Sequence, residues 1–104
     1  MRPKIPLAER IANACNLDPE TVAATLDGSD PLHLTNPCWL WQGSMAHITP
    51  MMKHDGRPQP VRRVIRAAMT GQPLSKFERV EQACPNFFCV YPGHSMVRHL
   101  KSPF

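Results

Sequence analysis

The sequence predicts a small α+β domain with a ββα arrangement preceded by an N-terminal helical hairpin. Three observations lead to this prediction. Apolar residues recur at helical spacing near the N-terminus, an Asp-Gly turn signal lies between two extended runs, and twelve prolines divide the 104 residues into short elements. A chain of this length forms one small domain, or one with an appended piece, and its core is marginal without a further constraint.

Two helices are expected in the N-terminal piece. Leu7, Ile11 and Cys15 recur at four-residue spacing, so they lie on one buried face, where Cys15 is a small core residue. Asp18 is a suitable N-cap for a second helix, because Pro19 follows it at the first helical position. Gly28 then lies just beyond the end of that helix. The pattern predicts a packed helical hairpin.

The segment "IANACNLDPETVAATLDG" resembles the helix-turn-helix of small bacterial repressors over its 18 residues. A recognition helix needs Arg, Asn or Gln to reach the edges of bases. The second helix instead carries Asp18 and Glu20, which DNA phosphates would repel. The charge therefore favours a helical hairpin that packs against the rest of the chain.

The charge pattern and a turn-rich stretch divide the chain in two. "GSDPLHLTNP" reads as a linker, so residues 1–36 are predicted to hold the helical hairpin with its linker, and residues 37–104 a second region. Residues 1–36 carry five acidic and three basic side chains, whereas residues 37–104 carry nine basic and three acidic ones. This asymmetry, with a net charge of +4, favours an acidic partner for the second region.

The second region is expected to contain a β-hairpin followed by a helix. Asp55 and the glycine after it form a turn signal between two arms, residues 47–52 and 59–64. Pro58 and Pro60 confine the second arm to the edge of a sheet or shorten it. The other expected elements are a "CWLW" strand that opens at Cys38, a helix over residues 61–70 ended by Gly71, a strand over 80–83, and a final helix from about His94 to Lys101.

The run "CPNFFCVYPGH" contains Cys84, Cys89 and His94, with four residues between each and the next, and Cys38 is available as a distant fourth ligand. These side chains make a Cys₃His set, the closed arrangement of a structural zinc site. Four protein ligands leave no position for water, so this zinc is expected to stabilise the fold and not to hydrolyse a substrate. The alternatives are a Cys84–Cys89 disulfide or thiols that bind nothing. Cys15 is predicted to stay free.

The sequence shows no apolar run near the ~20 residues that span a bilayer, and no leader-like N-terminal segment. A soluble, unsecreted protein with no membrane association is therefore expected. Such a protein meets a reducing cytoplasm, which favours thiolates over disulfides.

From Cys38 onward, about two thirds of the chain, the sequence resembles the HNH (His-Me finger) endonucleases of bacteriophages and their His-Cys-box relatives. The motifs that carry the resemblance are "CWLWQG", "VRRVIRAAMTG" and "EQACPNFFCVYPGHS". The resemblance implies a zinc-stabilised ββα domain whose structural ligands are Cys38, Cys84, Cys89 and His94. It also implies the cytoplasm of a bacterial host cell, if the protein is phage-encoded.

The catalytic positions of that family are not preserved. Its general-base histidine falls on Gln82, whose amide cannot take a proton from water near neutral pH, and its metal-binding asparagine falls on Pro103. Glu81 points to the opposite face of a strand and is poorly placed to substitute. Arg62 and Tyr91 replace two further family residues. Because loss of a general base alone costs roughly 10²–10⁴ in rate, the chain is predicted to be an inactive relative with no catalytic residues.

A basic face remains, and the predicted function is non-catalytic binding of DNA or another nucleic acid. In the family, the hairpin and the adjoining helix lie against DNA, so phosphate contacts would make such binding sensitive to salt. Simple solvation of the arginines is the alternative. The predicted nucleic-acid-binding residues are Arg57, Arg62, Arg63, Arg66, Arg98 and Lys101.

A second functional class is a protein-binding module, such as a phage factor that docks on and modulates a host enzyme, or a small virion component. The acidic N-terminal hairpin suits this class. Met51, Met52, Phe87 and Phe88 are candidate exposed contacts, since methionine and aromatic residues are enriched in protein interfaces. The two phenylalanines could instead pack beneath the zinc-binding loop.

Overall fold

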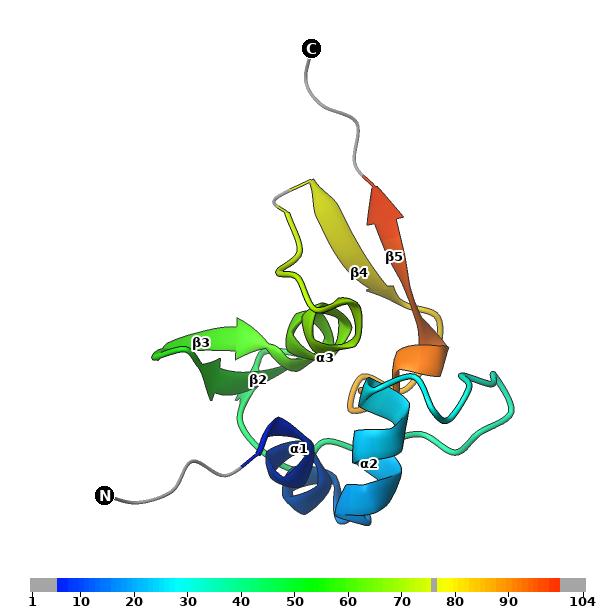
Figure 1. The fold of residues 1–104 in the computed structure, drawn as a ribbon. Helices are drawn as coiled ribbons and strands as arrows, with labels where there is room; N and C mark the ends of the chain where they lie inside the picture. Colours follow the sequence, from blue (N-terminus) through cyan, green and yellow to red (C-terminus); the bar gives the residue numbers. More distant parts are fainter. Residues whose placement is uncertain (1–5, 76, 100–104) are drawn as a thin grey trace.

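The structure is a computed structural model, and it describes residues 6–75 and 77–99 (Figure 1). It is a small α+β domain with an N-terminal helix pair, as predicted. The described residues contain no helix that is long and apolar enough to cross a bilayer. The elements are α1 (Leu7–Cys15), α2 (Pro19–Leu26), β1 (Met45–Ala46), β2 (Thr49–His54), β3 (Arg57–Pro60), α3 (Val61–Thr70), β4 (Glu78–Gln82), the 3₁₀ turn η1 (Pro92–His94) and β5 (Ser95–His99).

The helix pair follows the predicted local signals. Ile11 and Cys15 are buried on one face of α1, and Asn16 ends that helix in the left-handed conformation, with φ 56°. In α2 the carboxylate of Asp18 accepts a hydrogen bond from the backbone N–H of Glu20, at 3.4 Å, which confirms the predicted N-cap.

The hairpin is confirmed with shifted boundaries. β2 pairs antiparallel with β3, from Met51 opposite Pro60 to His54 opposite Arg57. The turn uses Asp55 and the following glycine, both at positive φ, as a two-residue hairpin turn requires. β1 adds a third strand on the far side of β2, so the sheet order is β1-β2-β3 and β3 lies at an edge, as its prolines demand.

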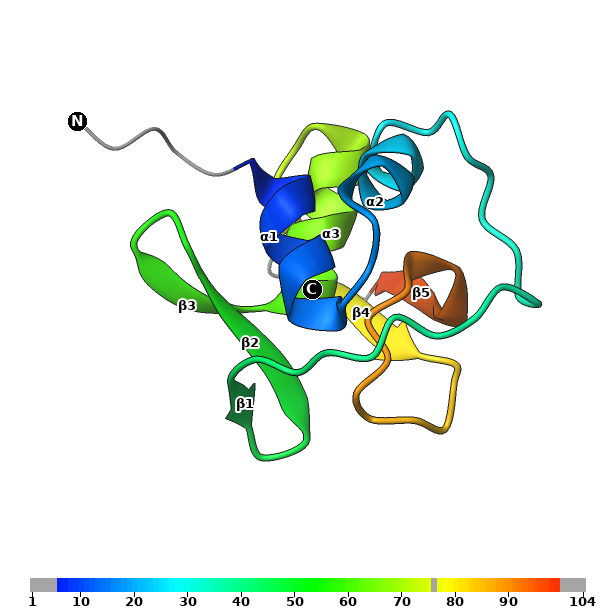
Figure 2. The same cartoon turned by 90° about the horizontal axis from the view of Figure 1, so that it is seen from below.

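The third helix holds the domain together. α3 spans the predicted residues 61–70, and Gly71 ends it in the left-handed conformation at φ 77°. Its buried residues are Val61, Val64 and Ile65. The three-stranded sheet, the β4–β5 pair and α2 all contact it, and the helix pair lies on one side of it (Figures 1 and 2).

One hydrophobic core joins the two regions predicted from the sequence. Ile11 and Val22 of the helix pair belong to the same buried cluster as Trp39, Ile65 and Val90. The N-terminal hairpin is therefore packed on the C-terminal region through buried side chains.

Two predicted elements are wrong. Residues 95–99 form strand β5 and not a helix, because they pair in register with β4, with Val97 opposite Val80. Lys101 and the rest of residues 100–104 lie outside the described part of the chain. The "CWLW" segment is no regular strand. It makes one isolated bridge, Leu40 opposite Cys89, which buries the tryptophans on either side of Leu40.

Candidate metal centre

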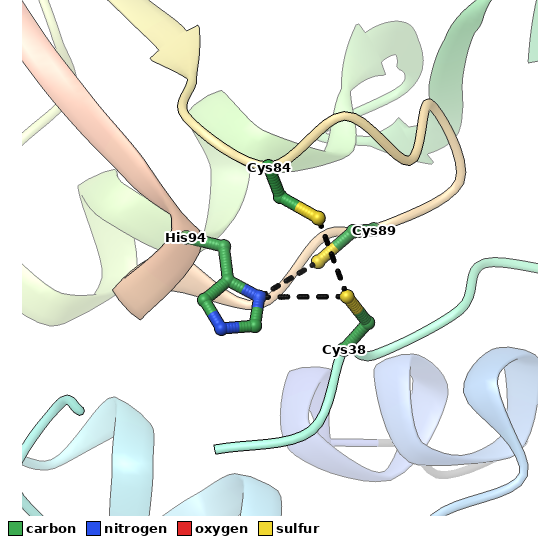
Figure 3. A group of neighbouring side chains, drawn as sticks. All are labelled: Cys38, Cys84, Cys89 and His94. Carbon is green, nitrogen blue, oxygen red and sulfur yellow. Dashed lines mark hydrogen bonds between the residues drawn. The ribbon is translucent and has the colours of Figure 1, made fainter. Parts of the chain in front are cut away.

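The structure brings the four predicted ligands together from two separate segments (Figure 3). Cys38 precedes the tryptophan-rich segment, Cys84 follows β4, and Cys89 and His94 lie further along the same loop. The four ligand atoms all lie within 4.8 Å of one another. Cys38 Sγ is 3.4 Å from Cys84 Sγ and 3.5 Å from His94 Nδ1, and Cys89 Sγ is 3.3 Å from His94 Nδ1.

These separations suit a tetrahedral zinc ion. With Zn–S near 2.3 Å and Zn–N near 2.0 Å, neighbouring ligand atoms of a Cys₃His tetrahedron lie about 3.5–3.8 Å apart, close to the three separations given above. Thiolates and imidazole are also the donors that zinc prefers over oxygen-binding cations. All four cysteines are free thiols, so the Cys84–Cys89 disulfide is not formed. Cys15 lies outside the ligand group, as predicted.

The histidine is oriented by its second nitrogen. His94 Nε2 lies 2.9 Å from the backbone carbonyl of Leu34, so the Nε2–H donates to that oxygen and Nδ1 is left to face the thiols. The Tyr91 ring meets the imidazole edge-on, with centroids 4.9 Å apart. The Tyr91 hydroxyl in turn accepts hydrogen bonds from Asn36 Nδ2 at 2.8 Å and from the backbone N–H of His33 at 3.2 Å. The predicted linker thus supports the metal centre.

The loop of residues 83–94, called the knuckle below, closes the end of the β4–β5 pair. The backbone N–H groups of Ala83 and Cys84 both donate to the carbonyl of His94, at 2.8 and 3.3 Å. These bonds continue directly from the last strand pair, Gln82 opposite Ser95. A metal bound to the knuckle would therefore fix the base of the two-stranded ribbon.

The thiols differ in how readily they ionise before a metal binds. Burial raises the pKa of the Cys38 thiol to about 12, and its hydrogen bond with Cys84 adds to the rise. The backbone N–H of Asn86 lowers the pKa of Cys84, which is therefore the readier thiolate of that pair. Burial also raises the pKa of Cys15 to about 12, as suits an inert core thiol.

The three predicted arginines of α3 are bound to backbone carbonyls of their own chain. Arg62 donates to Cys89 O from Nε at 3.1 Å and to Phe87 O from Nη2 at 2.8 Å. Arg66 Nη2 donates to the carbonyls of Pro92 and Ser95, at 2.7 and 2.8 Å. The two arginines thereby hold the knuckle against α3. The third, Arg63, donates to the carbonyls of Leu74, Ser75 and Glu78.

The other predicted basic residues differ in exposure. Arg57 is exposed at the hairpin turn, and Arg98 is exposed on β5, where its Nη1 lies 3.2 Å from Glu81 Oε1. Sequence reasoning did not single out Arg79, which is exposed on β4. The sequence did contain a signal for it. Arg79 lies two residues before Glu81, and because alternate residues of a strand share a face, Arg79 is expected on the same face as Glu81.

Gln82, which the resemblance aligns with the catalytic histidine of the HNH endonucleases, has structural contacts in this chain. The Gln82 side chain accepts a hydrogen bond from Arg62 Nη2 at 3.3 Å and donates one to the backbone carbonyl of Asn86. Glu81 faces the other side of β4 and pairs with Arg98. Pro103, at the position of the family's asparagine, lies outside the described residues.

No family model, curated protein or solved structure matches this chain. The resemblance to the HNH endonucleases therefore stays a prediction that rests on the motifs quoted above.

Proposed function

We propose that this chain is a non-catalytic, zinc-stabilised, HNH-like module that binds nucleic acid. The observation that carries the proposal is the convergence of Cys38, Cys84, Cys89 and His94 on one point. When bound, zinc would supply a structural cross-link between the segment before Trp39 and the knuckle. Four protein ligands leave no place for a water or substrate, so the ion would serve folding.

The absence of catalysis is proposed from the residue at the base position. Gln82 is held by Arg62 and by the backbone of Asn86, and a neutral amide does not accept a proton near neutral pH. The neighbouring carboxylate of Glu81 is directed to Arg98 on the other face of the strand. These contacts support the proposal that neither side chain activates a water molecule at the knuckle.

Charge supports a nucleic acid as the partner. Residues 37–104 carry nine basic and three acidic side chains. Arg62, Arg63 and Arg66 use their guanidinium groups within the chain, so exposed residues such as Arg57 and Arg98 are the better candidates for phosphate contacts. Binding of this kind is strongly dependent on salt.

A second candidate function, docking on a host protein, has an observation of its own. Phe87 and Phe88 at the tip of the knuckle are 52% and 51% exposed, and Leu40 nearby in the bridge to Cys89 is 43% exposed. Aromatic residues exposed in this way are typical of protein interfaces. Met52, a further candidate from the sequence, is 6% exposed and belongs to the core.

The test is a titration of labelled duplex DNA with the zinc-loaded protein at salt concentrations of about 50 and 200 mM, alongside incubation of plasmid with divalent cations. Binding that weakens with salt, with the plasmid left intact, is the expected result. Absence of binding at the lower salt concentration would contradict the proposal. A Phe87→Ser, Phe88→Ser variant is the control, since it should bind DNA normally and lose only a protein partner.

A further inference from the structure

The β4–β5 ribbon presents two arginines side by side. Arg79 and Arg98 are directly opposite each other in the strand register. Two residues further along the ribbon, Glu81 is opposite Met96. Because alternate residues of a strand share a face, these four side chains lie on the same side of the ribbon. Arg79, Met96 and Arg98 are exposed there. This outer face carries one acidic and two basic groups.

Like charges opposite each other destabilise a sheet, so a nearby anion would reduce the repulsion between the two arginines. Glu81 offsets Arg98, with 3.2 Å between Oε1 and Nη1. The Arg79 side chain makes no hydrogen bond or ion pair within residues 6–75 and 77–99. Its positive charge is thus not paired within those residues and is available to an external anion.

The shape of the ribbon suits duplex DNA. β4 and β5 run together away from the knuckle (Figure 1), and Arg63 of α3 holds the far end of β4 through its hydrogen bond to the Glu78 carbonyl. Five residue pairs at roughly 3.4 Å per residue give a ribbon about 17 Å long. The major groove of B-DNA, about 12 Å wide, admits a two-stranded β-ribbon. Met96, 55% exposed, would add an apolar contact to the base edges.

We propose that this outer face is the surface through which the chain binds duplex DNA, with Arg79 and Arg98 contacting phosphates at the groove. The inference rests on the proposed function and names its contact residues. The knuckle closes the base of the ribbon, so the metal centre holds the two arginines in register. Glu81 opposes binding, because it neutralises Arg98 and places a negative charge next to the phosphates.

The experiment is fluorescence anisotropy with labelled duplex DNA and the zinc-loaded full chain. Arg79→Ala and Arg98→Ala should each weaken binding roughly eightfold at about 0.1 M salt, and each should lower the slope of log affinity against log salt by about 0.9. Glu81→Gln should tighten binding. Lys53→Ala is the matched control, because Lys53 is exposed on β2 of the other sheet and carries the same charge, so its loss should change the affinity by less than about twofold.

The outcomes separate this inference from the proposed function. If the unmodified protein binds DNA but the two ribbon variants behave like Lys53→Ala, the ribbon is not the contact surface and the proposed function stands. If the unmodified protein does not bind at low salt, both fall. Zinc content measured on each variant checks folding. Glu81→Gln adds a gain-of-binding test, and unchanged or weaker binding by that variant would also overturn the inference.

Discussion

Arg62 of α3 donates a hydrogen bond from Nε to the backbone carbonyl of Cys89, at 3.1 Å, and so joins the central helix to a proposed metal ligand. The same guanidinium group reaches the carbonyl of Phe87 and the side chain of Gln82. One side chain therefore satisfies two backbone carbonyls of the knuckle and the side-chain oxygen of Gln82 at the end of β4. The positive charge of Arg62, which the sequence analysis assigned to nucleic-acid binding, is instead hydrogen-bonded within the fold.

Arg62→Ala should lower the free energy of unfolding by about 2–4 kcal/mol, because it leaves part-buried carbonyls without their donor. Arg57→Ala, at the exposed hairpin turn, should change it by less than about 0.5 kcal/mol. Urea unfolding of both zinc-loaded variants provides the comparison. Equal stability of the two variants would show that the Arg62 contacts contribute nothing to the fold.

Plasmid DNA should remain intact with the unmodified protein in the presence of magnesium, manganese or nickel. Gln82→His should restore little or no cleavage, because the position of the family's asparagine holds Pro103 and the new imidazole loses the contact to Asn86 O. Agarose gel assays of nicking and linearisation measure this. Robust nicking by the unmodified protein that one substitution abolishes would mean that the chain is an enzyme.

Zinc affinity should fall as the pH falls. The Cys38 thiol, with its pKa raised to about 12 by burial, is protonated at neutral pH before zinc binds, so zinc must displace its proton. Displacement of at least one proton predicts a loss of about tenfold or more in apparent affinity for each pH unit removed. Competition with a chromophoric chelator from roughly pH 8 to pH 6 measures the slope. A flat profile would exclude Cys38 as a thiolate ligand.

Local signals carried much of the fold prediction. The Asp18-Pro19 pair marks the start of a helix and the glycine after Thr70 marks the end of one. α2 begins at Pro19 and α3 ends at Thr70, as those markers predict. The ligand group was predictable because cysteine and histidine at short loop spacing have few other roles in a small domain. Signals of this kind act within a few residues and do not depend on the tertiary structure.

The features that the sequence did not predict depend on contacts between residues far apart in the chain. Residues 95–99 have no local preference strong enough to separate helix from strand, and their pairing with β4 is decided across the knuckle. The partners of Arg62 and Arg66 lie more than twenty residues away in sequence, in carbonyls that only the folded knuckle presents. A sequence shows that a guanidinium group is present but not whether it meets a phosphate or its own backbone.

Metal analysis combined with X-ray absorption of the purified protein addresses the metal centre directly. We expect one zinc per chain, with three sulfur ligands near 2.3 Å and one nitrogen near 2.0 Å. Cys84→Ser should lose the metal and unfold the ribbon, whereas Cys15→Ala, the control, should keep the full zinc content. Protein without zinc, a fourth ligand that is water oxygen, or normal zinc content in Cys84→Ser would contradict a closed Cys₃His centre.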